Sequence, residues 1–143
     1  MSKVQTPYDE LTYKIIGIAM AVHNELGPGF PEEIYQRAMG VGMDSEGVPH
    51  DRKFQIEVTF RGQVIGKFEL DLVADKKVIL ELKAVAALAP IHERQVIAYL
   101  AASGLPVGLL INFGAAKLEF KRFYPPKAVQ SSEAYQRRHS ESG

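Results

Sequence analysis

The segment Val78-Ile79-Leu80-Glu81-Leu82 constrains the fold of this chain more than any other. Its residues are apolar with one exception, the carboxylate of Glu81. A strand with apolar side chains on both faces belongs in the centre of a sheet, where other elements cover both sides. The sequence therefore predicts a sheet with helices packed against it.

Four further segments have the patterns of strands: residues 54–60, 64–74, 107–112 and 117–124. Apolar and polar residues alternate from Phe54 to Phe60, as in a half-buried strand. Tight turns at Arg61-Gly62-Gln63 and Asp75-Lys76-Lys77 join the first two of these strands and the central strand into an antiparallel meander. The segment 117–124 is expected at an edge of the sheet.

Three segments predict helices. The first has apolar residues at three- and four-residue steps, which form one stripe of an amphipathic helix: Leu11, Ile15, Ile18, Ala19, Val22 and Leu26. Gly27-Pro28-Gly29 ends it, and a second helix follows from Pro31 to about Glu46. A third spans residues 90–103 and stops at Gly104. The order α-α-β-β-β-α-β-β predicts an α/β fold, a mixed five-stranded sheet with flanking helices.

The length of 143 residues suits one domain, and we expect it to occupy residues 1–124. Residues 125–143 are rich in Ser, Glu, Gln and Arg and hold few large apolar side chains. Such a composition buries too little apolar surface to offset the entropy of ordering. We therefore expect a disordered C-terminal tail.

Charge and composition exclude several classes of protein. The 17 basic and 17 acidic side chains cancel, which argues against binding nucleic acid by bulk charge alone but leaves room for a local basic rim. No cysteine is present, so disulfides, thiolate zinc sites and iron–sulfur clusters are excluded. The chain has no apolar run long enough to span a membrane and no apolar signal core at its N-terminus, so a cytoplasmic setting is expected.

Asp71, Glu81 and Lys83 form the candidate chemical site. Side chains two residues apart on a strand share a face, so Glu81 and Lys83 point the same way. The turn after Ala74 brings the preceding strand back antiparallel, which places Asp71 roughly opposite Glu81. Two adjacent carboxylates repel each other unless a cation lies between them, and oxygen ligands suit Mg²⁺ or Mn²⁺. An ion pair at the rim of a sheet is the simpler alternative.

The third predicted helix adds a second pattern. Gln95 and Tyr99 lie four residues apart on one helical face, and His92 lies three residues before Gln95. A Gln/Tyr pair alone is more often a surface feature. Glu32, in the first turn of the second helix, can be read as a residue that complements the helix dipole.

The segment Gly29-Phe30-Pro31-Glu32-Glu33-Ile34-Tyr35 has the pattern G-x-x-E-x-x-Y. With this signature the chain resembles the GxxExxY proteins of the PD-(D/E)XK nuclease superfamily, and the resemblance covers about residues 8 to 124. It continues through Leu70-Asp71-Leu72, Leu80-Glu81-Leu82-Lys83-Ala84-Val85, Pro90-Ile91-His92-Glu93-Arg94-Gln95, Tyr99-Leu100 and Gly108-Leu109-Leu110-Ile111-Asn112-Phe113-Gly114. Gln95-x-x-x-Tyr99 is similar to the RecB and lambda exonuclease branch, and Leu70 stands where the superfamily's name has proline.

This resemblance implies a restriction-endonuclease-like core and an active site of Glu32, Asp71, Glu81 and Lys83, supported by Gln95 and Tyr99. It implies a nuclease that hydrolyses phosphodiester bonds, with DNA as the expected substrate. Asp71, Glu81, the carbonyl oxygen of Leu82 and Glu32 are the expected ligands of Mg²⁺ or Mn²⁺.

The candidate phosphate contacts are Arg37, Arg52, Lys53 and Arg94. The rival hypothesis is a non-catalytic nucleic-acid-binding or assembly module that keeps the nuclease fold. Because so small a domain offers little surface for gripping DNA, we expect a homo-oligomer. The apolar stripe of the first helix or the edge strand near Lys117–Phe123 could supply its contact.

Overall fold

The computed structural model describes residues 8–142, in which the elements follow the predicted order and two further helices close the chain. The helices are α1 (Asp9–Leu26), α2 (Glu32–Ser45), α3 (Pro90–Ser103), α4 (Lys127–Gln130) and α5 (Glu133–Ser142). The strands are β1 (His50–Phe60), β2 (Gln63–Ala74), β3 (Val78–Lys83), β4 (Val107–Asn112) and β5 (Glu119–Phe123). The predicted bounds of the third helix are confirmed, whereas β1 begins four residues earlier than expected.

The five strands form one mixed sheet in the order β1-β2-β3-β4-β5. β1, β2 and β3 are antiparallel neighbours, β4 runs parallel to β3 because α3 carries the chain back across the sheet, and β5 is antiparallel to β4. Arg61 and Gly62 have φ values of 49° and 79° at the tip of the β1–β2 hairpin, as a tight two-residue turn requires. The predicted mixed sheet, with Val78–Lys83 at its centre, is confirmed.

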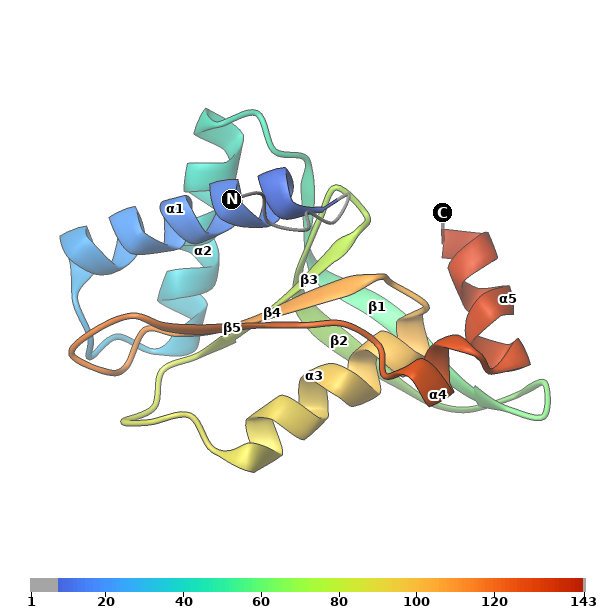
Figure 1. The fold of residues 1–143 in the computed structure, drawn as a ribbon. Coiled ribbons are helices and arrows are strands. Elements are labelled where there is room, and N and C mark those ends of the chain that lie inside the picture. Colours follow the sequence, from blue (N-terminus) through green and yellow to red (C-terminus); the bar gives the residue numbers. More distant parts are fainter. Residues whose placement is uncertain (1–7, 143) are drawn as a thin grey trace, which may run out of the picture.

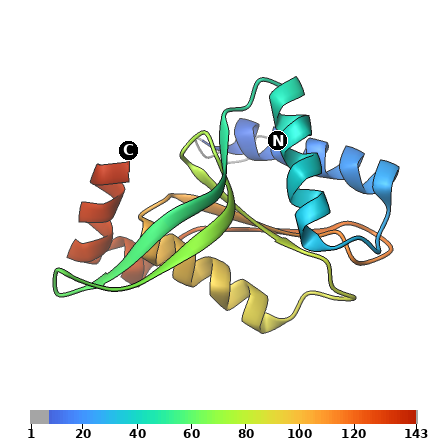
Figure 2. The same ribbon diagram turned by 180° about the vertical axis from the view of Figure 1, so that it is seen from behind.

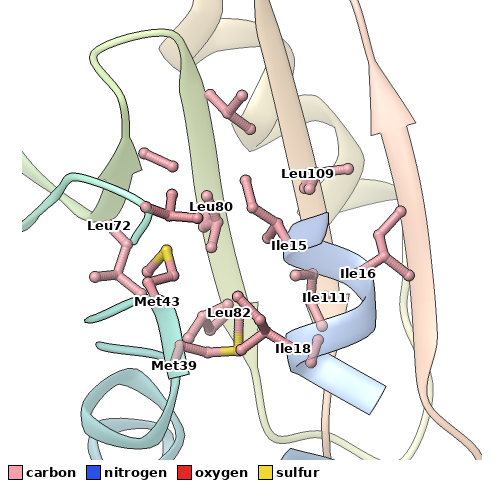
Figure 3. Packing of buried hydrophobic residues seen from close by; sticks show 14 of the residues in the cluster. Ile15, Ile16, Ile18, Met39, Met43, Leu72, Leu80, Leu82, Leu109 and Ile111 are labelled. Carbon is pink, nitrogen blue, oxygen red and sulfur yellow. The ribbon is translucent and has the colours of Figure 1, made fainter. Parts of the chain in front are cut away.

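Helices cover the two faces of the sheet unequally. α1 and α2 lie on one face, and α3 lies on the other (Figures 1 and 2). Figure 3 shows the larger core, in which side chains of α1 and α2 meet those of β2, β3 and β4: Ile15, Ile16, Ile18, Met39, Met43, Leu72, Leu80, Leu82, Leu109 and Ile111. Alternate residues of β3 enter the two cores, with Leu80 on the α1–α2 side and Ile79 on the α3 side.

The apolar stripe of α1 packs into this core. Ile15 and Ala19 are fully buried, and Ile16 and Ile18 are nearly so. The middle of the stripe is therefore taken up by the core, and Leu11, Val22 and Leu26 at its ends are half-buried. β5 is the edge strand that the sequence predicted, and its outer side has no neighbouring strand in the described part of the chain.

The C-terminal segment is folded, so the predicted disordered tail is wrong over residues 127–142. Tyr135 of α5 is 6% exposed, and its hydroxyl donates a hydrogen bond of 3.1 Å to the carbonyl of Leu105. Arg138 donates to the carbonyls of Ala101 and Thr59, at 3.0 and 3.1 Å.

The approach of α5 to the end of α3 depends on a glycine. A Cβ at Gly104, whose φ is 76°, would lie 2.5 Å from the backbone of Arg138. Hydrogen bonds and one aromatic side chain hold this helix, which a count of apolar residues could not reveal.

The helices give no sign of a membrane segment: within residues 8–142, none is both long and apolar enough to cross a bilayer.

Candidate active site

The site lies where β2 and β3 stop pairing. Their register joins Ala74 to Val78 and Leu72 to Leu80, and it would continue to Asp71 and Glu81. There the side chain of Asp71 takes the place of a backbone partner, because the N–H of Leu82 donates a hydrogen bond of 2.8 Å to Asp71 Oδ2. Asp71 is thereby fixed beside β3.

β2 changes its orientation at this point. Leu70 and Val73 pack on the α3 side of the sheet, whereas Leu72 packs on the α1–α2 side. Regular alternation would put Leu70 and Leu72 on the same side, so the strand is irregular at Asp71. Across from it on β1, Lys53 has a left-handed backbone with φ of 54°. Irregular backbone in the middle of a strand pair often accompanies a functional site.

Glu81 and Lys83 point from β3 toward α3. Glu81 is 5% exposed, and its Oε2 lies 3.9 Å from Nζ of Lys83. The same Nζ donates a hydrogen bond of 3.2 Å to Oε1 of Gln95, so α3 holds the lysine in place. The structure thus brings Asp71, Glu81, Lys83 and Gln95 together.

The surroundings of the two carboxyl groups disfavour their ionised forms. Burial, together with the negative charge of Asp71, raises the pKa of Glu81 to about 8, although Lys83 opposes the shift. Burial also raises the pKa of Asp71, against the hydrogen bond from the Leu82 backbone. Glu81 Oε1 is buried without a hydrogen-bond partner among the described residues. A buried oxygen of this kind is stabilised either by a proton shared with Asp71 or by a bound cation.

Tyr99 lies one turn after Gln95 and borders the carboxyl pair. Burial raises its pKa, as do the charges of Glu81 and Asp71. Its ring packs on Phe68 of β2, with ring centres 4.6 Å apart. Gln95 and Tyr99 therefore line the same side of the site, while Val96 between them is fully buried in the core.

Glu32 reaches the site from the start of α2, on a segment distant in sequence. Burial raises its pKa, the charge of Asp71 raises it further, and Lys83 and His92 lower it. These interactions put the carboxylate near Asp71 and Lys83, although α2 packs on the face of the sheet opposite α3.

His92 stabilises the start of α3, because its Nδ1 accepts a hydrogen bond of 3.0 Å from the N–H of Ala89.

The signature tyrosine explains how Glu32 is held. Tyr35 is fully buried, stacks on Phe113 at 4.6 Å, and donates a hydrogen bond of 2.6 Å from its hydroxyl to the carbonyl of Gly27. The hydroxyl also accepts a hydrogen bond from the N–H of Phe30. The turn before α2 is thereby pinned to the helix, one turn from Glu32.

A buried asparagine was missed in the sequence. Asn112 ends β4, and its side chain forms hydrogen bonds with both the N–H and the carbonyl of Val85, at 3.0 and 2.9 Å. Its amide also donates to Glu119 at 2.7 Å. Asn112 thus anchors the loop that leads from Lys83 to α3. The signal was available, since a lone amide at the end of an apolar strand needs several partners.

The ligand set fits a hydrated divalent cation. No cluster of three or more His, Cys, Asp or Glu side chains suited to a metal occurs within residues 8–142, so Glu32 does not complete a three-carboxylate site with Asp71 and Glu81. The N–H and carbonyl of one strand residue point to the same side, which places the Leu82 carbonyl on the side of Asp71. Mg²⁺ commonly binds one or two carboxylates and keeps several waters, which this site allows.

Comparison with known proteins identifies the fold family. The profile of the PD-(D/E)XK nuclease superfamily matches residues 9–123. The chain belongs to this superfamily. Among curated proteins, none is significantly similar in sequence.

Two solved structures share the fold of this PD-(D/E)XK protein. The crystal structure of SSO0001 matches with a TM-score of 0.54 and 18% identity, over 94% of this chain and 66% of that one. An alkaline exonuclease (LHK-Exo) from Laribacter hongkongensis matches with a TM-score of 0.51 and 10% identity, over 96% of this chain and 82% of that one. The chain spans about two thirds of the length of the first.

Three of the four candidate phosphate contacts gather beside Glu32. Arg37, Arg52 and Lys53 each lie within 3.7 Å of a carboxylate oxygen of Glu33. Arg94 is exposed on α3.

Proposed function

We propose that this PD-(D/E)XK protein is a metal-dependent nuclease that hydrolyses phosphodiester bonds in DNA. The observation that carries the proposal is the pair formed by buried Glu81 and half-buried Asp71, with an unpartnered oxygen on Glu81 and Lys83 beside it. A rim ion pair would need neither the burial nor the second carboxylate. Membership of the nuclease superfamily indicates the class of reaction. The DNA substrate and the metal ion are proposed here.

Each residue of the site has its own role in the proposed reaction. Asp71, Glu81 and the Leu82 carbonyl would hold Mg²⁺ or Mn²⁺, and Glu32 adds a negative charge beside them. When bound, such an ion lowers the pKa of a water and neutralises charge on the phosphate. Lys83 presents its ammonium group to the attacking water or to the charge that develops on phosphorus, and Gln95 keeps it oriented. Tyr99 closes the side of the site with its ring.

The rival function is a nucleic-acid-binding module without catalysis. Both functions require DNA binding, but only the nuclease requires Lys83 to act in the transition state. The proposed assembly is a homo-oligomer, and the open edge of β5 is a surface suited to it.

The test is digestion of single- and double-stranded DNA with Mg²⁺, with Mn²⁺ and with EDTA. We expect cleavage with the metals only. Lys83→Ala should lower kcat by about a hundredfold or more while KM changes little, because the lysine acts mainly in the transition state. Lys77→Ala, an exposed lysine just before β3, serves as the matched control and should cleave normally.

Two outcomes would count against this function. Full activity of Lys83→Ala would remove the lysine from the mechanism. Binding of DNA by the wild type without metal-dependent cleavage would favour the binding module.

A further inference from the structure

Three cationic side chains converge on one oxygen atom beside the site. Oε1 of Glu33 lies 3.7 Å from Nη2 of Arg37, 3.7 Å from Nη2 of Arg52 and 3.5 Å from Nζ of Lys53. One carboxylate balances one of the three positive charges, so the cluster of Arg37, Arg52, Lys53 and Glu33 carries an excess of two. Like charges this close repel each other unless further anionic charge is supplied.

The backbone is shaped to bring these cations together. Neighbouring residues of a regular strand point to opposite faces, yet Arg52 and Lys53 both approach the same carboxylate oxygen. The left-handed conformation of Lys53, with φ of 54°, makes this possible. A lysine rarely adopts that conformation, because its Cβ crowds the backbone. A surface ion pair formed by chance would not need a strained residue inside a strand.

Arg52 retains unused hydrogen-bonding capacity. Its Nε and Nη2 atoms are buried and have no hydrogen-bond partner within the described residues. The distance of 3.7 Å from Nη2 to Glu33 is too long for a hydrogen bond. A guanidinium offers its N–H groups as a planar fork that matches phosphate oxygens. The cluster therefore has the positive charge to attract a phosphate, and Arg52 holds donors that no protein group uses and that are covered in the free protein.

The cluster adjoins the candidate active site. β1 pairs with β2 through Arg52 and Leu72 and through Phe54 and Leu70, so Lys53 stands across from Asp71. Glu33 directly follows Glu32, the carboxylate that interacts with Asp71. An anion held here would lie beside the carboxyl pair.

We propose that Arg37, Arg52 and Lys53 bind a backbone phosphate of the DNA strand next to the one that is cleaved. Glu33 holds the three cations in the free protein and competes with that phosphate. The proposal takes its substrate from the proposed function and adds the residues that grip the strand. Contacts of this kind fix the position of the strand and carry no base specificity.

The experiment measures DNA binding without cleavage. Fluorescence anisotropy of a fluorescein-labelled oligonucleotide, single-stranded and duplex, is recorded in EDTA over a series of NaCl concentrations. Arg37→Gln and Lys53→Gln should each weaken binding by roughly threefold or more and lower the salt dependence by about one released counterion. Glu33→Gln should tighten binding by a similar factor, because it removes the competing charge. Lys14→Gln, at an exposed lysine on α1, is the charge-matched control and should bind as the wild type does.

The direction of the Glu33→Gln effect separates this proposal from a purely structural cluster. If Glu33 only stabilises the fold through ion pairs, its neutralisation lowers the melting temperature and leaves DNA binding unchanged. Unchanged affinity and salt dependence in Glu33→Gln and Lys53→Gln would overturn the proposal, as would absence of DNA binding by the wild type. Binding that follows the predicted pattern without any metal-dependent cleavage would support the cluster and overturn the nuclease function alone.

Discussion

Glu81 is the residue whose surroundings differ most from those of an ordinary carboxylate. It is the one charged residue in the apolar run from Val78 to Leu82, it is 5% exposed, and Asp71 stands beside it. Keeping an ionised carboxylate there is costly without a cation, so the metal-free protein holds this group protonated up to a pH of about 8. The site therefore destabilises the empty fold at neutral pH.

That cost predicts a pH dependence of stability in EDTA. Between pH 4.5 and about 8 the folded chain keeps the Glu81 proton that the unfolded chain releases, so this group makes stability fall as pH rises through that window. The side chain of Glu81→Gln stays neutral at every pH, so this variant lacks the loss of stability. Urea unfolding at pH 5, 6.5 and 8 measures the free energy of unfolding of both proteins. Relative to the wild type, that of the variant should increase as pH rises, by on the order of a few kcal/mol at pH 8.

The control for this measurement is Glu57→Gln, at an exposed glutamate of β1. Its stability should follow that of the wild type across the range. A constant difference between Glu81→Gln and the wild type from pH 5 to pH 8 would show that Glu81 does not carry a raised pKa.

At the scale of elements, short connections place the chemistry. The turn after α1 is pinned by the hydroxyl of Tyr35, and the loop after β3 is pinned by the side chain of Asn112. Both anchors are buried polar groups with several hydrogen-bond partners, which fixes a single arrangement of the backbone. Glu32 on one side and Gln95 on the other are thereby held against the carboxyl pair.

α5 contributes to stability rather than to the site. It packs on the end of α3 and on β1 through Tyr135 and Arg138. Deletion of residues 127–143 should lower the free energy of unfolding by about 2–4 kcal/mol, the scale of one buried aromatic side chain and a few hydrogen bonds. Metal-dependent cleavage at low temperature should persist, because none of the proposed site residues belongs to α5.

Thermal unfolding followed by circular dichroism tests this prediction. Tyr135→Phe removes only the hydroxyl and should cost about 1 kcal/mol, which separates that hydrogen bond from the packing of the ring. An unchanged melting temperature after the deletion would show that α5 does not dock on the domain.

At the scale of the whole molecule, the metal and the fold are linked. A ligand that binds only the folded chain stabilises it according to its concentration and affinity, by about 2.7 kcal/mol at a hundred times the dissociation constant. MnCl₂ should therefore raise the melting temperature in a concentration-dependent way at pH 8. Asp71→Asn should abolish the increase, because it removes one of the two carboxylates that would hold the ion.

Glu25→Gln, at an exposed glutamate of α1, is the control for non-specific binding of Mn²⁺ and should keep the full increase. Equal increases in the wild type and in Asp71→Asn would place any bound metal elsewhere on the chain.

Local rules acting over a few residues determined much of this protein. The two-residue period of strands put Glu81 and Lys83 on one face, and the turn at residues 75–77 set Asp71 across from Glu81. Proline at the start and glycine after the end fixed the bounds of α3, and with them the place of Gln95 and Tyr99 on one helical face. These features could be predicted because each depends on neighbours in the sequence.

Only the tertiary structure decided which distant segments meet. Glu32 lies near Asp71 because α2 packs its apolar face on the sheet, and Lys53 joins Arg37 at Glu33 because β1 changes its backbone conformation at one residue. The docking of α5 rests on hydrogen bonds to the backbone carbonyls of Leu105, Ala101 and Thr59. No periodicity encodes such contacts, because they depend on the shapes and free polar groups of surfaces that exist only once the sheet has formed.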